Sequence, residues 1–171
     1  MTETKHCNIC DRTLSINKFN IDRKTPDGHN HYCKDCCNEK AKNYRETPRG
    51  VYTTIKGRQD YHHRNNGNPA KPFNIEMDEF VEWYEAQERK CVYCDIPEEY
   101  IPLMAEKYGS NWNRLTIDCK DNDIGYRIDN LVLACAKCNI TKSNLFTYEE
   151  WYEIAQKYMK PKWQALIDKL L

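Results

Sequence analysis

Residues 114–144 read RLTIDCKDNDIGYRIDNLVLACAKCNITKSN, and this segment decides the fold of the chain. Residues 114–118 alternate in polarity as a strand does, and residues 130–134 form a second short apolar run. The acidic stretch between them contains a glycine and is typical of a loop. Cys135 and Cys138 then stand at the entrance to a helix. The segment predicts two strands joined by a loop and followed by a helix.

A second cysteine pair with the same spacing, Cys91 and Cys94, lies upstream of this segment. Two Cys-x-x-Cys units can close one tetrahedral four-thiolate zinc site, here completed by Cys135 and Cys138. Such a site would fix the helix to the strands. Because four sulfur ligands leave no open coordination position, we predict that this zinc is structural and that a catalytic ion is bound elsewhere.

The N-terminal part contains two further Cys-x-x-Cys units on either side of a turn at residues 26–28. This pattern predicts a zinc ribbon with four thiolate ligands: Cys7, Cys10, Cys33 and Cys36. The second unit is ambiguous, because Cys37 follows it directly and two histidines, His29 and His31, lie close by. We assign no ligand role to Cys37.

Composition limits the class of protein. The chain has 171 residues, of which 40% are hydrophobic and 10 are cysteines. It contains no apolar signal region and no run of about 18 apolar residues, so we expect a cytoplasmic protein without a membrane partner. In a reducing compartment, paired cysteines indicate zinc rather than disulfides. Zinc is expected to contribute folding energy, because the apolar cores are small.

The charges are balanced over the whole chain, with 26 basic and 26 acidic residues, but they are unevenly distributed. Residues 1–72 carry 14 Lys and Arg against 8 Asp and Glu, together with all five histidines. Residues 73–171 carry 12 against 18. The basic excess of the first part suits a polyanionic partner, so salt-dependent binding is expected mainly from there.

Much of the basic excess lies in a connector, residues 38–72, with eight Lys and Arg against three acidic residues. Three glycines and three prolines interrupt it, so we expect its helices to be short. Two interpretations stay open: a track for nucleic-acid phosphates, or a solvated linker.

Helical patterns flank the central segment. Asn74 can cap a first helix, and a second is expected to begin at Pro97 and to end at Gly109. Thr147 begins a capping box for a helical tail, which Pro161 is expected to break. The apolar stripes of this tail pack either on the domain or on a second copy of the chain, so a homodimer is one option.

Two oxygen-bearing side chains are brought together by the predicted zinc clamp: Asp118 at the end of the first strand and Asn139 in the first turn of the helix. Such ligands, completed by phosphate and water, suit Mg²⁺ or Mn²⁺ better than zinc. The ion would polarise a phosphate and stabilise a leaving oxygen. Lys142, one helical step from Asn139, can counter phosphoryl charge. Each residue also has a structural interpretation, as a turn cap, a helix cap and a solvated cation, respectively.

These motifs together resemble the HNH (ββα-metal) endonucleases, in the variant that ends on Asn rather than His. The resemblance rests on the two core cysteine pairs, on Leu115-Thr-Ile-Asp118, on Asp129-Asn130-Leu-Val, and on Asn139 with Lys142. The N-terminal cysteine pairs and the basic connector are similar to small two-zinc restriction and phage members of that family.

The resemblance implies a small, zinc-stabilised α+β fold. Its parts would be an N-terminal zinc ribbon (residues 1–37), a connector that contacts DNA (38–72), a ββα-metal nuclease core (73–146) and a C-terminal helical tail (147–171). Asp118 and Asn139 match the family's metal ligands, and Asn130 matches an asparagine that orders the loop between the strands. Cys119 occupies the position where the family usually has its histidine base.

Another group must therefore activate water if the chain is a nuclease. His62 and His63, in the connector, are the first candidates, and the alternative for either is a surface or phosphate-contacting residue. Tyr126 could orient water. Cys119 itself is an unattractive base beside a hard ion, and an inert buried thiol is expected.

The sequence thus predicts a Mg²⁺- or Mn²⁺-dependent endonuclease that hydrolyses double-stranded DNA. One alternative is a non-catalytic zinc module that binds DNA or RNA, which the missing histidine supports. A zinc-stabilised adaptor for protein partners is a third, and it leaves Asp118, Asn139 and Lys142 without a role.

Overall fold

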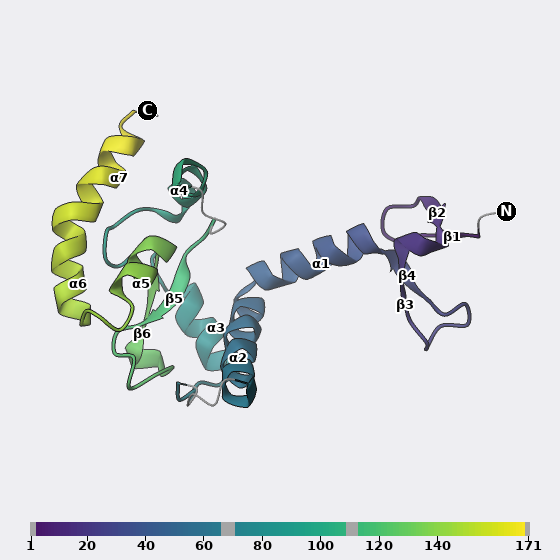
Figure 1. The fold of residues 1–171 in the computed structure, drawn as a ribbon, viewed down its shortest axis with the longest axis horizontal. Coiled ribbons are helices and arrows are strands. Elements are labelled where there is room, and N and C mark those ends of the chain that lie inside the picture. The colour runs from purple at the N-terminus through teal and green to yellow at the C-terminus, as the bar shows by residue number, and fades with distance from the viewer. Residues whose placement is uncertain (1–2, 66–70, 109–112, 170–171) are drawn as a thin grey trace. The chain divides into compact units, whose positions relative to one another are not determined.

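The computed structural model describes residues 3–65, 71–108 and 113–169 (Figure 1). The chain forms two compact units, Met1–Ile55 and Lys56–Leu171. Both combine short two-stranded sheets with helices, and each contains a cysteine cluster, so the predicted small α+β class is confirmed. No helix within the described ranges is long and apolar enough to cross a membrane.

The N-terminal unit is built from two antiparallel hairpins and a helix. Its strands are β1 (Thr4–His6) paired with β2 (Thr13–Ser15), and β3 (Phe19–Ile21) paired with β4 (His29–Cys33), with a short turn η1 (Ile16–Lys18) between the hairpins. Gly28 takes a φ of 72° in the predicted turn. The core consists of Phe19 packed among buried cysteines, so a cysteine cluster stands where a larger domain has apolar side chains.

Two consecutive helices, α1 (Lys34–Glu46) and α2 (Pro48–Asn65), run through most of the predicted connector. The expectation of short helices there is wrong. Pro48 occupies the first position of α2, where its missing N–H has no helical partner to lose. A Cβ at Gly50 would lie 1.8 Å from the Tyr44 carbonyl oxygen. This glycine therefore permits a close approach between successive helices and does not interrupt α2.

The second unit contains the predicted strand, loop, strand and helix. These are β5 (Thr116–Cys119), a single turn η3 (Ile128–Asn130), β6 (Leu131–Ala134) and α5 (Ala136–Lys142). The strands pair antiparallel, with Asp118 opposite Val132. Cys135 is the N-cap of α5, and its sulfur accepts the Cys138 N–H. The cysteine spacing thus serves the helix start as well as the metal cluster.

Three helical elements precede this hairpin: α3 (Met77–Glu85), η2 (Glu98–Tyr100) and α4 (Ile101–Tyr108). The predicted cap at Asn74 is wrong, because Glu76 caps α3 in a capping box with Glu79. Asn74 instead donates its backbone N–H to the Tyr126 carbonyl at 3.0 Å, which holds this segment beside the hairpin loop. Helical structure begins after Pro97 as expected, and the predicted end at Gly109 lies outside the described residues.

The C-terminal tail is one helical run of α6 (Tyr148–Ile154), a π-helical turn η4 (Ala155–Met159) and α7 (Lys160–Ile167). The Thr147 capping box is confirmed. Pro161 does not break the run, because it lies in the first turn of α7, directly after a wider π turn that accommodates its ring. Trp151 and Trp163 are buried, so this part of the apolar stripes packs within the chain.

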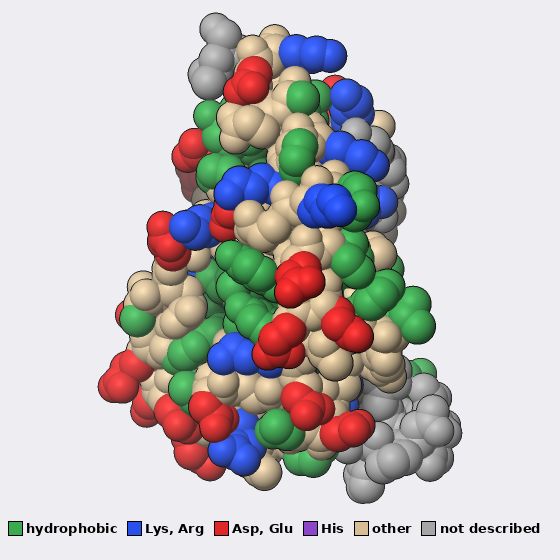
Figure 2. Space-filling model, turned by 90° about the vertical axis from the view of Figure 1, so that its left-hand side faces the viewer, with side chains coloured by type: hydrophobic (Ala, Val, Ile, Leu, Met, Phe, Trp, Pro, Cys, Tyr) green, Lys and Arg blue, Asp and Glu red, His purple; other side chains and the backbone are tan. Residues whose placement is uncertain are grey.

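Figure 2 shows the side of the molecule that carries the tail, with acidic side chains gathered over its lower part. The exposed carboxylates of α6 are Glu149, Glu150 and Glu153. A surface of this charge repels phosphate, so the α6 side is not suited to a nucleic-acid backbone.

Candidate functional site

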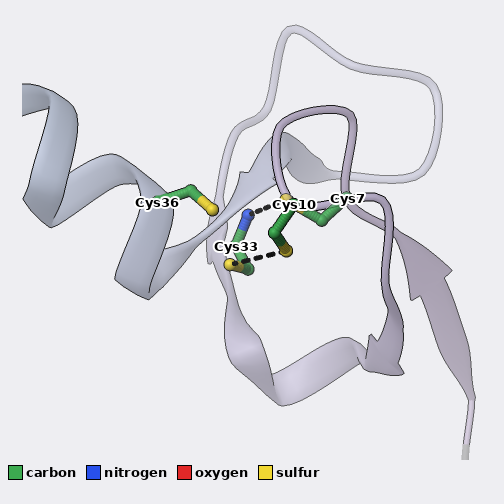
Figure 3. A group of neighbouring side chains, drawn as sticks. All are labelled: Cys7, Cys10, Cys33 and Cys36. Carbon is green, nitrogen blue, oxygen red and sulfur yellow. Dashed lines mark hydrogen bonds between the residues drawn. The ribbon is translucent and has the colours of Figure 1, made fainter.

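Eight cysteine sulfurs form two clusters, each able to hold one metal ion, and within each cluster they lie within 4.8 Å of one another. In the N-terminal unit the ligands come from the β1–β2 loop, from the end of β4 and from the first turn of α1 (Figure 3): Cys7, Cys10, Cys33 and Cys36. The second cluster joins the knuckle before η2 to the start of α5: Cys91, Cys94, Cys135 and Cys138. Both predicted ligand sets are therefore brought together, and Cys37 belongs to neither.

The distances between sulfurs fit tetrahedral zinc. Cys94 Sγ and Cys135 Sγ are 3.8 Å apart, and Cys10 Sγ and Cys33 Sγ are 4.0 Å apart. A tetrahedron with Zn–S bonds of about 2.3 Å has edges of about 3.8 Å. All ten cysteines are free, and these separations are far longer than a disulfide bond.

Backbone N–H groups favour the thiolate form that zinc requires. The Cys33 N–H donates to Cys7 Sγ at 3.2 Å. The N–H groups of Cys10 and, to a smaller extent, Cys33 lower the pKa of the Cys7 thiol, against the opposing effect of burial. Burial raises the pKa of the Cys36 thiol in the same cluster, so the backbone favours the thiolate at Cys7 in particular.

Asp118 is a buried carboxylate held from two sides. The Tyr93 hydroxyl donates to its Oδ2 at 2.7 Å, and Lys142 Nζ lies 3.5 Å from the same oxygen. Tyr93 lies between Cys91 and Cys94 of the second cluster, and Lys142 ends α5, so the knuckle and the helix together orient the Asp118 side chain. Both contacts use Oδ2, which leaves Oδ1 as the oxygen through which Asp118 could bind a cation.

Burial raises the pKa of the Asp118 carboxyl above its usual range. The Tyr93 hydroxyl and the positive charges of Lys142 and Lys71 act in the opposite direction. A divalent cation at this position would favour the ionised carboxylate further.

Asn139 is fixed against the strand that carries Asp118. Its Nδ2 donates to Thr116 Oγ1 and to the Ile117 carbonyl oxygen, each at 3.1 Å. Since both hydrogen bonds use the amide nitrogen, Oδ1 remains available as a ligand atom. The structure therefore places Asn139 beside β5, as the zinc clamp predicts, next to the residue that precedes Asp118.

Asn130 orders the loop between the strands. Its Nδ2 donates to the carbonyl oxygens of Asp121 and Gly125 at 2.7 Å each, and its Oδ1 accepts the Asp121 N–H at 3.0 Å. Gly125 has a φ of 75°, and a Cβ there would lie 2.6 Å from the Pro72 carbonyl oxygen. The loop is thus held from inside by an amide and from outside by close backbone contact.

Lys142 occupies a position that its sequence does not reveal. Its ammonium group is fully buried and donates to the Cys119 carbonyl oxygen at 2.8 Å, in addition to its contact with Asp118. The interpretation as a solvated cation is wrong. Direct contact with a phosphoryl group stays a prediction, whereas the contact with Asp118 is observed.

The candidate bases differ in their surroundings. Burial raises the pKa of the Cys119 thiol to about 11 and that of Tyr126 to about 12, so neither is suited to accept a proton near neutral pH. His62 and His63 belong to α2, one turn beyond Gln59, and their side chains lie outside the described part of the structure. Gln59 Nε2 donates to the Tyr126 hydroxyl at 3.3 Å, which places this part of α2 beside the hairpin loop.

Sequence reasoning missed two contributors to the site. The role of Tyr93 could have been predicted, because a tyrosine between two cysteines of a buried cluster needs a hydrogen-bond partner for its hydroxyl. Lys71 gave no such signal. It reaches Asn122 in the hairpin loop and adds positive charge near Asp118.

Replacing Tyr93 by phenylalanine is expected to lower the free energy of unfolding by about 1.5–3 kcal/mol, the contribution of a hydrogen bond to a charged group. Urea denaturation would measure the change. Tyr152→Phe is the matched control, because Tyr152 is exposed on α6 and should leave stability within about 0.5 kcal/mol of the parent. Equal stability of the two variants would contradict a structural role for the Tyr93–Asp118 hydrogen bond.

A strand hairpin, a helix at its end and a four-cysteine cluster that joins them define the ββα-metal class of fold. No protein-family model matches the chain, and no curated protein matches it. Among solved structures, the chain is similar to PacI, a rare-cutting HNH restriction endonuclease whose structure was described for its perturbation of DNA. The two share 22% sequence identity over 94% of this chain and 96% of that chain, with a TM-score of 0.53. The resemblance predicted from the sequence is confirmed for the fold.

Proposed function

We propose that the chain is an endonuclease that hydrolyses phosphodiester bonds of double-stranded DNA with one divalent metal ion. The observation that carries the proposal is the position of Asp118 and Asn139, which are fixed on neighbouring elements with one oxygen each left for a cation. The shared fold with an HNH restriction endonuclease supports the same activity and DNA as the substrate.

In this proposal, Asp118 Oδ1 and Asn139 Oδ1 hold Mg²⁺ or Mn²⁺, the ions that oxygen ligands favour. When bound, the ion polarises the scissile phosphate and stabilises the leaving 3′ oxygen. Tyr93 and Lys142 keep the Asp118 carboxylate in position, and Asn130 keeps the loop closed beneath it. The two zinc ions would be structural, because four thiolates leave no open coordination position.

The base that activates water is proposed to be His62 or His63. A neutral imidazole suits proton abstraction near neutral pH. Both residues follow Gln59 on α2. Gln59 donates a hydrogen bond to Tyr126, which lies in the loop that joins β5, the strand of Asp118, to β6. The base would thus come from α2 rather than from the hairpin, where Cys119 occupies the position of the usual histidine.

Replacing His62 and His63 by alanine one at a time is expected to show which of the two is the general base. Loss of a general base lowers turnover by about 10²–10⁴-fold, so one variant should nearly stop cleaving while its DNA affinity stays within about twofold. The other should cleave normally. Plasmid cleavage rates and duplex binding of both variants provide the measurement, and two variants with parental rates would exclude both residues.

The proposed function is tested by incubating the purified chain with supercoiled plasmid and Mg²⁺ or Mn²⁺. Nicked or linear products that require the divalent ion are expected. Binding of the plasmid without cleavage in either metal would contradict a nuclease.

That outcome would favour the second candidate function, a non-catalytic zinc module that binds DNA or RNA. The observation in its favour is Cys119, which is buried and is held as a thiol at the position of the family's usual base. The two candidates share the basic N-terminal part and differ in whether Asp118 and Asn139 act on a phosphate.

Cleavage of both strands by one such site requires either a homodimer or two successive nicks, and we propose the homodimer.

We also propose a reducing cytoplasmic location, which fits ten cysteines that form no disulfide. Restriction, homing and other phage or mobile-element roles use the same chemistry.

A further inference from the structure

Helix α1 exposes nearly its whole surface. Within its 13 residues Cys36 is buried and Cys37 is half-buried, while the others are exposed. A helix of this length is marginal in water on its own, since about 12–15 residues are needed even in favourable sequences. The cysteine cluster anchors its beginning, because Cys33 is the N-cap and Cys36 a predicted zinc ligand. Packing within the unit therefore fixes one end of α1 and does not explain the composition of the rest.

Seven of the exposed polar side chains of α1 form two stripes along the helix, and Lys40 and Asn43 lie outside both. The basic stripe recurs at i, i+4, i+8 and i+11 and consists of three basic residues and one amide, namely Lys34, Asn38, Lys42 and Arg45. Lys34 Nζ donates to the Asn17 carbonyl oxygen at 2.8 Å, so Lys42 and Arg45 are the cations considered for a partner. The acidic stripe begins one residue later, about 100° around the helix, and consists of Asp35, Glu39 and Glu46. The two stripes are adjacent, and Lys42 with Glu46 has the i, i+4 spacing that also stabilises a solvated helix. Cations that recur on one side of an exposed helix suit contact with a polyanion.

A third side of α1 is turned toward β4. Lys40 Nζ lies 5.2 Å from the centre of the Tyr32 ring, and Cys37 Sγ lies 3.6 Å from the Tyr32 carbonyl oxygen. Asn38 and Lys42, on the basic stripe, lie on a different side of the helix from these contacts. The basic stripe is therefore exposed on a helix whose start is fixed in place.

We propose that α1 enters the major groove of duplex DNA with its basic stripe toward the bases and phosphates. The major groove admits an α-helix. Lys42 and Arg45 suit phosphate oxygens or guanine, and Asn38 has the amide that pairs with adenine. The choice of duplex DNA as partner rests on the proposed function. Charge complementarity supports it, because the basic stripe carries three cationic side chains and no acidic one.

The test measures binding of a fluorescein-labelled DNA duplex to the full chain carrying Asp118→Asn, so that cleavage does not interfere. Lys42→Gln/Arg45→Gln is expected to weaken binding about tenfold or more. The slope of log affinity against log salt should also fall by about 1.8, because about 0.9 is lost for each phosphate contact. The matched control is Lys157→Gln/Lys162→Gln, which removes the same charge from exposed positions of the tail and should bind within about twofold of the parent.

The inference would be overturned if the α1 variant bound DNA with the affinity and salt slope of the parent. It would also be overturned if the tail control lost as much affinity as the α1 variant. Either result would leave α1 as a spacer. A duplex RNA of the same sequence is the second probe, and tighter binding to RNA than to DNA would also overturn it. Asn38→Ala should keep the salt slope and relax the preference for adenine in competition between duplexes. Plasmid nicking by the unsubstituted chain is read separately. Failure to nick, together with stripe-dependent binding, would refute the proposed function and leave this inference standing.

Discussion

Exchanging Asp118 for asparagine is expected to slow plasmid nicking by about a thousandfold or more while duplex binding stays within about twofold. A catalytic metal contributes several kcal/mol to stabilising the transition state, and about 1.4 kcal/mol corresponds to a factor of ten. The binding surface proposed on α1 lies in the other compact unit, so affinity should not depend on this carboxylate. Single-turnover nicking and fluorescence anisotropy measure the two effects.

Asparagine is preferable to alanine because of the buried contacts of Asp118. Lys142 is fully buried and loses its carboxylate partner when Asp118 is removed. Breaking a buried ion pair from one side costs about 3–5 kcal/mol. Both substitutions remove the charge, but Asp118→Ala also removes the acceptor of the Tyr93 hydroxyl, so it could unfold the unit and imitate a catalytic defect. An asparagine oxygen can still accept the Tyr93 hydroxyl. The double variant Asp118→Asn/Lys142→Met removes both charges and serves as the matched control for charge balance.

The outcomes distinguish chemistry from folding. Both variants should melt cooperatively and neither should nick, if Asp118 binds the catalytic ion. Nicking at the parental rate by a folded Asp118→Asn chain would exclude Asp118 as a required metal ligand. Restoration of nicking in the double variant would show that the single substitution acted through the unpaired Lys142.

The hairpin and helix of the core were predictable because their signals are local. Alternating polarity marks β5, an acidic loop with Gly125 follows it, and the cysteine pair of α5 caps the helix that it joins to the zinc site. Cysteine spacing also predicted which cysteines cluster, since paired Cys-x-x-Cys units are typical of metal sites. These features depend on a few neighbouring residues each.

The features that were missed depend on the three-dimensional surroundings. Helix propensity alone predicts that Gly50 interrupts a helix. In the structure, Gly50 instead allows the Tyr44 carbonyl oxygen to lie where a Cβ would be. Lys142 reads as a surface lysine until the fold closes Asp118 and the Cys119 carbonyl around it. The hydrogen bond from Tyr93 to Asp118 likewise joins elements that are far apart in the sequence and meet at the cysteine cluster. Local patterns thus predicted the core hairpin and its helix, and the contacts between distant elements decided how the candidate site is held.

Replacing Cys91 and Cys94 by serine is expected to abolish cooperative unfolding of the Lys56–Leu171 unit. The cluster joins the knuckle to α5, and its four sulfurs are fully or almost fully buried. Structural zinc sites bind with about 10–16 kcal/mol, which is as large as the whole stability of a typical domain, about 5–15 kcal/mol. The chain should then hold one zinc ion in place of two, and nicking should be lost with the fold.

The N-terminal cluster provides the matched comparison, because it lies in the other compact unit. Cys7→Ser/Cys10→Ser should also remove one zinc ion, yet leave the melting transition of the ββα unit in place while duplex binding weakens with the loss of α1's anchor. Cys37→Ser, outside both clusters, should keep two zinc ions and parental stability. Metal content by colorimetric release and thermal melting by circular dichroism measure all three variants. A Cys91→Ser/Cys94→Ser chain that melts like the parent with one zinc ion would show that apolar packing, rather than the metal, holds β5, β6 and α5 together.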